Sequence, residues 1–204
     1  MSTADFLVEL GTEELPPNTL NTLMQAFADE VGRGLDEARL EHGEIRAYAS
    51  PRRLAVIVDE LASAQASRDV QQKGPPVKIA FDDAGEPAAP ALAFARKCGV
   101  DVATLDRVAT EKGEWLVYNA TEEGRSTADL IGPIVSDALN RLPIARRMRW
   151  GDGDAEFVRP VHWLVMLHGE DVVETSVLGL ASGRQTRGHR FHSPEPFDIP
   201  EPSR

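Results

Sequence analysis

Hairpin signals outnumber strand–helix–strand signals in this chain, and this balance most constrains the fold. Residues 107–110 and 114–121 are two alternating segments joined at Lys112-Gly113, and residues 161–167 and 172–178 form a second pair. Short alternating segments around Gly-containing turns are typical of antiparallel hairpins. The pattern therefore predicts an α+β fold, with mixed or antiparallel sheets and flanking helices.

The first sixty residues indicate the order strand, helix, strand, strand. The strands are predicted at residues 5–10, 44–49 and 54–61. Between the first two, apolar side chains recur at helical spacing and predict an amphipathic helix. We expect this helix to begin at Asn18 or Thr19 and to run to about Leu40.

The middle of the chain contains prolines, which interrupt regular helices and strands. Two prolines within residues 73–76 predict a loop, because proline cannot enter a central strand, and residues 77–81 are predicted as an edge strand. Helices are predicted at residues 91–98 and from Thr127 onward. Pro133 predicts either a kink in the second helix or a later start.

These segments give four predicted parts. The first strand–helix–strand–strand unit covers residues 1–62, and residues 63–142 are a candidate inserted subdomain. Residues 143–193 hold a hairpin and an arginine-rich segment that we expect to pack with the first unit. Residues 194–204 are predicted to be an extended tail or a linker, because they are rich in proline. The pattern leaves open whether one domain or two subdomains form.

The composition excludes several classes of protein. The 204 residues include 22 Lys and Arg against 33 Asp and Glu, and 42% of them are hydrophobic, which is ordinary for a globular chain. The single cysteine, Cys98, cannot form an internal disulfide. The longest apolar run is too short to span a bilayer, and the first thirty residues lack the pattern of a secretory signal. We therefore expect a soluble, cytoplasmic protein with no membrane partner.

The strongest candidate binding site is a set of arginines interleaved with flat rings. The segment 183–192 contributes Arg184, Arg187, His189, Arg190 and Phe191. A separate cluster contributes Arg146, Arg147 and Arg149, and a third, weaker basic turn contributes Arg52 and Arg53. Guanidinium groups suit phosphate, and rings stack on the bases of single-stranded RNA. No acid lies between Glu174 and Glu195. The alternative has equal weight: a solvated loop whose arginines pair with carboxylates elsewhere in this acidic chain.

The sequence shows no pattern of a catalytic centre. It lacks a Gly-rich phosphate loop with its lysine, and it lacks the Gly-x-Ser-x-Gly motif of hydrolases. His189 and His192 would share a helical face as metal ligands, but Gly and Pro around them disfavour a helix. We therefore predict no catalytic residue, no metal and no cofactor in this chain.

Six segments, taken together and in order, resemble the beta subunit of the bacterial heterotetrameric glycyl-tRNA synthetase. They are Leu7–Pro17, Ser50–Val56, Lys73–Lys78, Met148–Gly151, Phe157–Leu164 and Thr186–His192. The resemblance covers essentially the whole chain but only the amino-terminal part of the family protein. The family's later helical HD-like region and its carboxy-terminal anticodon-binding domain have no counterpart here.

The resemblance implies a division of labour. In this family the alpha subunit carries the class II active site, where ATP and Mg activate glycine, and the beta subunit supplies much of the tRNA binding. The chain is then expected to be a non-catalytic fragment that supports charging of tRNA-Gly within an alpha2-beta2 assembly and is inactive alone. The alternative is a pure subunit-assembly module with no direct RNA contact.

Overall fold

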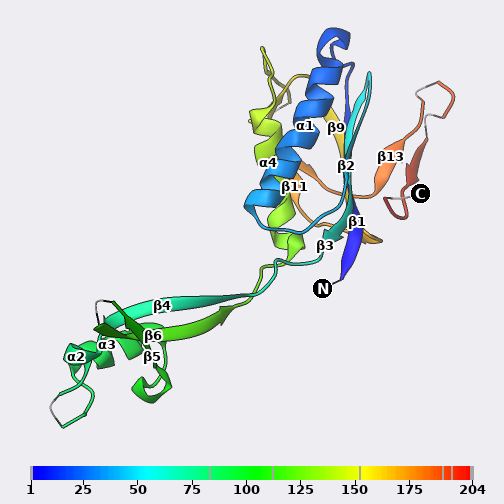
Figure 1. The fold of residues 1–204 in the computed structure, drawn as a ribbon. Coiled ribbons are helices and arrows are strands. Elements are labelled where there is room, and N and C mark those ends of the chain that lie inside the picture. Colours follow the sequence, from blue (N-terminus) through cyan, green and yellow to red (C-terminus); the bar gives the residue numbers. More distant parts are fainter. Residues whose placement is uncertain are drawn as a thin grey trace. The chain divides into compact units, whose positions relative to one another are not determined.

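The computed structural model describes residues 2–82, 84–111, 113–151, 153–189, 191–193 and 195–202. It divides into two compact units (Figure 1). Unit 1 comprises residues 1–66 and 125–204, and unit 2 comprises residues 67–124. Unit 2 lies within the predicted inserted segment 63–142. The last part of that segment forms helix α4 (Thr127–Arg141), which belongs to unit 1 because it packs on helix α1 (Pro17–Glu37).

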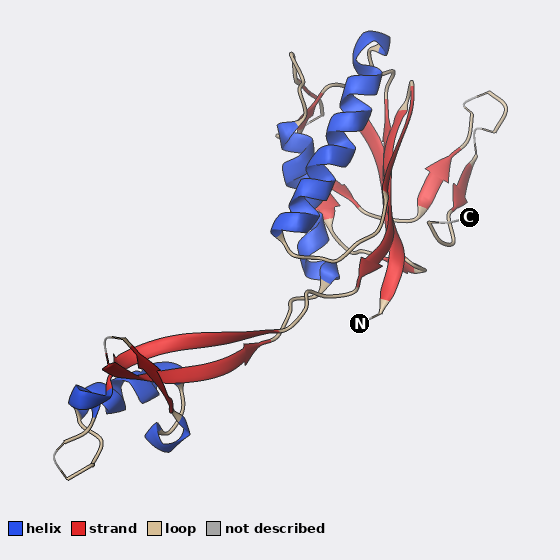
Figure 2. Ribbon diagram, in the orientation of Figure 1, coloured by secondary structure: helices blue, strands red, loops and turns tan. Residues whose placement is uncertain are grey.

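Unit 1 is built on a five-stranded sheet in which all neighbouring strands are antiparallel. In spatial order the strands are β10 (Asp171–Val172), β9 (Val161–His168), β1 (Thr3–Thr12), β3 (Arg53–Ala62) and β2 (Ile45–Ser50). Helices α1 and α4 lie side by side on one face of this sheet (Figure 2). The predicted α+β class with antiparallel sheets is confirmed. No helix in the described residues is long and apolar enough to cross a membrane.

Alternation along β1 divides its side chains between the two faces of the sheet. Phe6, Val8 and Leu10 are buried against the helices, in one cluster with Phe27 of α1 and Val135 of α4. Full burial of one such side chain contributes about 1.5–3 kcal/mol to folding. This helix-covered face is therefore the main core of unit 1.

Helix α1 begins at Pro17, slightly before the predicted start, and ends at Glu37 rather than near Leu40. Proline is tolerated at the first helical position, because the N–H there has no intrahelical partner. A Cβ on Gly34 would lie 2.6 Å from Cγ2 of Ile134 in α4. This glycine therefore allows the two helices to approach closely.

Helix α4 begins at Thr127, but its N-cap is Ser126. The Ser126 hydroxyl accepts a hydrogen bond from the backbone N–H of Asp129 at 3.2 Å, and the Thr127 hydroxyl donates to the Ala62 carbonyl. The helix continues through Pro133, so the predicted later start is wrong.

The face of the sheet opposite the helices carries a smaller apolar cluster, which includes Leu7 and Val165. Part of its cover is a hairpin of β13 (Gln185–Arg187) and β14 (Pro196–Asp198), and Ile199 just after this hairpin packs on the cluster. Residues 196–198, predicted as part of a tail or linker, therefore form a paired strand. Pro194 and residues 203–204 lie outside the described residues.

The predicted hairpin between 161–167 and 172–178 is wrong in its second half. Only β10 and Val173 continue along β9, and the Val173 N–H donates to the Met166 carbonyl at 3.0 Å. Leu178 and Gly179 then adopt positive φ angles of 52° and 77°. The tight turn at these two residues pairs β11 (Ser176–Val177) with β12 (Leu180–Ala181) instead.

Unit 2 has a three-stranded sheet with helices on one face. Its elements are β4 (Arg68–Pro76), α2 (Val77–Ala80), α3 (Ala89–Cys98), the 3₁₀ helix η1 (Val102–Thr104), β5 (Asp106–Thr110) and β6 (Gly113–Glu122). The sheet order is β4-β6-β5, and Phe94 of α3 and Leu116 of β6 lie in its core. The predicted hairpin of β5 and β6 is confirmed, with Lys112 outside the described residues.

Two predictions for unit 2 are wrong. The predicted loop at 73–76 is the end of β4, and the predicted strand at 77–81 begins with the one-turn helix α2. The first error has a physical cause. β4 is an edge strand with a register shift between Lys73 and Pro76, and proline is tolerated at such edges and bulges.

Candidate nucleic-acid interface

The three central strands of unit 1 bring separate parts of the chain together where β1 ends and β3 and β9 begin. Gly11 of β1 is paired both with Arg53 of β3 and with Trp163 of β9. Paired residues of neighbouring strands share a face of the sheet. A Cβ built on Gly11 would lie 1.9 Å from Cε2 of the Trp163 indole. The glycine therefore provides the space that the indole occupies.

A buried carboxylate lies beside this tryptophan. Glu9 is 5% exposed, and its Oε1 accepts hydrogen bonds from the Trp163 indole N–H at 2.9 Å and from the Thr186 hydroxyl. Arg53 Nε lies 3.4 Å from Glu9 Oε2, as an ion pair without hydrogen-bond geometry. Buried charges are stable when they are paired and hydrogen-bonded. Glu9 therefore holds Trp163 and joins β13 to the sheet.

Two guanidinium groups flank the Trp163 ring. Those of Arg53 and Arg187 lie 5.9 Å and 6.0 Å from the ring centroid, at the limit of cation–π contact. Arg53 also donates a hydrogen bond to the Arg187 carbonyl. The Arg187 side chain is exposed, and it forms no ion pair with any residue that the structure describes. It is therefore a cation open to an external anion.

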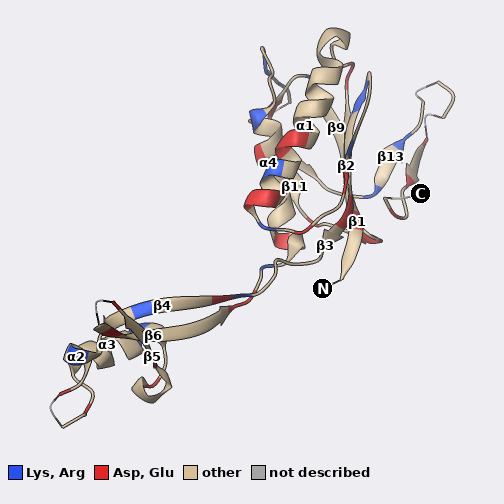
Figure 3. Cartoon of the chain, viewed as in Figure 1, with Lys and Arg blue, Asp and Glu red and all other residues tan. Residues whose placement is uncertain are grey.

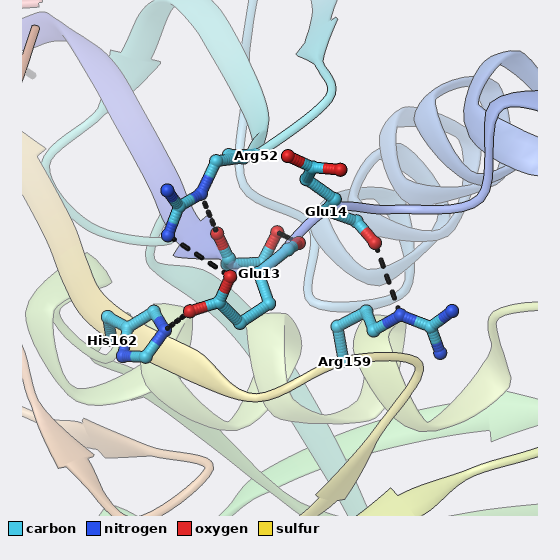
Figure 4. A network of polar contacts seen from close by, with 6 residues as sticks. Glu13, Glu14, Arg52, Arg159 and His162 are labelled. Atoms are coloured by element: carbon cyan, nitrogen blue, oxygen red, sulfur yellow. Dashed lines mark hydrogen bonds and ion pairs between the residues drawn. The ribbon is translucent and has the colours of Figure 1, made fainter. Parts of the chain in front are cut away.

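A second polar network adjoins the first (Figure 4). Glu13 accepts from His162 Nε2 at 2.8 Å and lies 3.2 Å from Nη2 of Arg52. Arg159, which sequence reasoning did not single out, donates from Nε to the Glu14 carbonyl at 3.1 Å. The Arg52 charge is thus largely compensated by a local carboxylate.

The loop after β13 carries the exposed rings. His189 is exposed, Phe191 is 75% exposed, and their ring centroids are 6.0 Å apart. The backbone N–H groups of His192 and Ser193 both donate to the His189 carbonyl, which forms a turn. Arg190 lies outside the described residues. The described part of this loop therefore presents flat surfaces to solvent beside Arg187.

Arg184 has a different environment from Arg187. Its guanidinium donates to the backbone carbonyls of Glu170 at 2.8 Å, Pro200 at 3.4 Å and Ile199 at 3.5 Å. The residue is half-buried, and its contacts tie the segment after β14 to the turn between β9 and β10. Arg184 and Arg187 are only three residues apart in the sequence, but they differ in exposure.

The arginines at 146–149 lie on the other side of the sheet from β13, near the helices (Figure 1). Arg147 donates to the Leu139 and Asn140 carbonyls at 3.2 Å and 2.7 Å, which satisfies acceptors at the C-terminal end of α4. Arg149 is exposed and lies 3.5 Å from Asp154 in the link between β7 (Met148–Arg149) and β8 (Glu156–Phe157). Arg146 is exposed and has no partner among the described residues. The structure does not join this cluster to the segment from Arg187 to Ser193, which we call the Arg187 loop.

Sequence reasoning missed Glu9, the buried anchor of the site. One signal was present: Glu9 interrupts the apolar run Phe6–Leu10. An acid in such a run is expected to be buried and therefore paired. In the part of the chain that the structure describes, no three His, Cys, Asp or Glu side chains are grouped to hold a metal ion.

The fold and the site together define an α+β module with arginines and exposed rings at one end of its main sheet. A family model described as "Glycyl-tRNA synthetase beta subunit" matches residues 6–204. The glycine–tRNA ligase beta subunits of Marinobacter nauticus and Stutzerimonas stutzeri are 48% and 51% identical over 203 residues, 100% of this chain and 29% of each relative. That of Haemophilus influenzae is 49% identical over 199 residues, 98% of this chain and 29% of the relative.

The chain belongs to the glycyl-tRNA synthetase beta subunit family. It spans 29% of the length of these curated relatives. The relatives are named as subunits of a ligase, so the resemblance found in the sequence motifs is confirmed.

Proposed function

We propose that this chain is the amino-terminal, non-catalytic part of a glycine–tRNA ligase beta subunit and contacts tRNA through the Arg187 loop. In this proposal it works in the cytoplasm, within an assembly with the alpha subunit. Glycine is activated there with ATP and Mg, and this chain has no activity alone. The tRNA substrate is tRNA-Gly.

The observation that carries the proposal is the setting of Arg187. Its guanidinium is exposed, lies 6.0 Å from the Trp163 ring centroid and has no ion pair to a described carboxylate. The exposed rings of His189 and Phe191 follow within four residues. An exposed cation can contact a phosphate, and a base stacked on an adjacent ring contributes about 1–3 kcal/mol.

Within the proposed set, the arginines have different roles. Arg187 and Arg190 are retained as phosphate contacts, with His189 and Phe191 as stacking surfaces. Arg146 and Arg149 are a separate exposed pair. Arg52, Arg53, Arg147 and Arg184 already have internal partners, so we propose that they support the site rather than bind RNA directly.

The test compares Arg187, the last residue of β13, with Arg184 just before this strand, both in the assembled ligase. Arg187→Ala should weaken tRNA binding several-fold and make the dependence of log K on log salt shallower by about one unit. Glycine-dependent ATP–pyrophosphate exchange should not change. The matched control, Arg184→Ala, should lower the melting temperature and leave the salt slope intact. Unchanged tRNA affinity and slope in Arg187→Ala would refute the RNA contact.

A second candidate function is subunit assembly without RNA contact. The observation that favours it is a groove beside the edge strand β2, whose lining includes Asp29, Asp36 and Glu44. Acidic surfaces repel RNA and suit a basic protein segment. The two candidates rest on different surfaces of unit 1, the residues from Arg187 onward and the β2 edge.

A further inference from the structure

Strand β2 forms an edge of the main sheet. It pairs with β3 and with no other strand in the described part of the chain. Its six residues contain one charged side chain, Arg46, and no proline, and its register with β3 has no bulge. Charges, prolines and bulges are the usual protection of edge strands against pairing. The outer edge of β2 is therefore able to accept another strand.

A groove of about 690 Å³ lies along this edge, between β2 and α1. Half-buried Ile45 and Ala47 of β2 line it, together with Gly32 of α1. A Cβ on Gly32 would lie 2.9 Å from Cδ1 of Ile45, so the helix and the strand are in close contact at this point. The groove thus combines an apolar surface with an unpaired backbone edge, as required for strand addition.

The two arginines that line the groove are already paired with acids. Arg33 lies 2.6 Å from Glu30 and also pairs with Glu37, and these contacts raise its pKa. Arg46 lies 2.5 Å from Asp59, and this hydrogen bond raises the pKa of Arg46. Both cations are therefore compensated and add little positive potential to the groove.

The acids of the groove are less compensated. Asp29 of α1 and Glu44, just before β2, are exposed and have no hydrogen bond or ion pair from their side chains to a described residue. Asp36 lies 3.4 Å from His42. Acidic positions mark the same helix in Figure 3. The groove is therefore anionic and complementary to Lys or Arg side chains.

We propose that the β2 edge accepts an extended, basic segment of the ligase's other subunit as a sixth strand of the sheet. Main-chain hydrogen bonds to β2 supply the pairing, and Lys or Arg side chains of the segment lie opposite Asp29 and Glu44. This proposal rests on the proposed place of the chain within a glycine–tRNA ligase.

The test uses full-length beta and alpha subunits, purified separately, and measures their association by titration calorimetry at low and high salt. The beta variant Asp29→Lys/Glu44→Lys should weaken association by about tenfold at low salt, and less at high salt. The matched control, Asp137→Lys/Glu174→Lys, makes the same change of charge at exposed acids outside the groove and should change the affinity less than twofold.

Hydrogen exchange provides a second readout that does not depend on a variant. Alternate amides of residues 45–50 donate to β3, and the others point outward from the edge. The outward-pointing amides should become protected when the alpha subunit is added to the beta subunit. Equal affinities for the two double variants, or no added protection, would overturn the proposal. Protection of these outward-pointing amides already in the beta subunit alone would also overturn it, since the occupant would then be the same chain or a second copy.

Failure of this proposal is distinguishable from failure of the proposed function. If the RNA contact is wrong, only the Arg187 variant departs from expectation, and subunit association behaves as described. If the chain is not part of such a ligase, the wild-type subunits do not associate at all.

Discussion

The indole N–H of Trp163 donates a 2.9 Å hydrogen bond to the carboxylate of Glu9, although these residues are 154 positions apart in the sequence. The same Glu9 oxygen accepts from Thr186 of β13. This carboxylate therefore connects β1, β9 and β13 at the point where Arg187 projects from the sheet. The exposed cation and its supporting ring depend on one buried acid.

Replacement of Glu9 should destabilise the chain. Glu9→Leu leaves the Trp163 N–H and the Thr186 hydroxyl without an acceptor and the Arg53 cation without its paired carboxylate. We expect a loss of about 2–5 kcal/mol in the free energy of unfolding. Glu9→Gln keeps an acceptor oxygen and should lose less. Urea unfolding of both variants measures this order. A Leu variant as stable as wild type would show that the network contributes little.

The contact between Gly11 and Trp163 gives a second prediction. Gly11→Ala places a methyl group where the indole lies, and overpacking of this kind lowers stability by about 1–3 kcal/mol. Gly183→Ala is the control, because a Cβ there has nothing within 4 Å. Thermal unfolding compares the two. Equal melting temperatures would mean that Trp163 moves aside without loss.

Arg147 and Arg146 are adjacent but should differ in their effect on stability. Arg147→Ala removes the donors to the Leu139 and Asn140 carbonyls near the end of α4, and we expect a loss of about 1–2 kcal/mol. Arg146→Ala should change stability by less than about 0.5 kcal/mol, as for most exposed sites. Chemical unfolding measures both values, and similar values for the two variants would contradict the helix-capping role.

The chain alone should not activate glycine or charge tRNA. Its motifs include no nucleotide-binding loop, and the family resemblance implies an active site in the other subunit. Glycine-dependent ATP–pyrophosphate exchange measures this, with the same preparation plus alpha subunit as the positive control. Steady exchange above background without alpha subunit would overturn the expectation.

The sequence predicted elements where local patterns are regular. Apolar spacing predicted the body of α1, and alternation around Lys112-Gly113 predicted the hairpin of β5 and β6. The errors occur where pairing outweighs local preference. Residues 73–76 extend an edge strand despite two prolines, and residues 176–177 pair with a new strand after a turn at Leu178-Gly179.

The candidate site was only partly predictable, because its arginines look alike in the sequence. Arg184 lies just before β13 and Arg187 is its last residue, yet Arg184 is bound to three carbonyls and Arg187 is exposed. Arg147 caps a helix, whereas Arg146 beside it is exposed. Charge and spacing identify such residues as candidates, but they do not show which carbonyl or carboxylate lies within reach.

The sequence by itself determined the α+β class, the family and most helix and strand positions, since these follow from local periodicity and from motifs read along the chain. The tertiary structure decided which arginines are open and that Glu9 supports Trp163. It also decided that β2 is an edge strand beside an acidic groove. These properties depend on contacts between residues far apart in sequence, which form only when the antiparallel registers bring distant strands together.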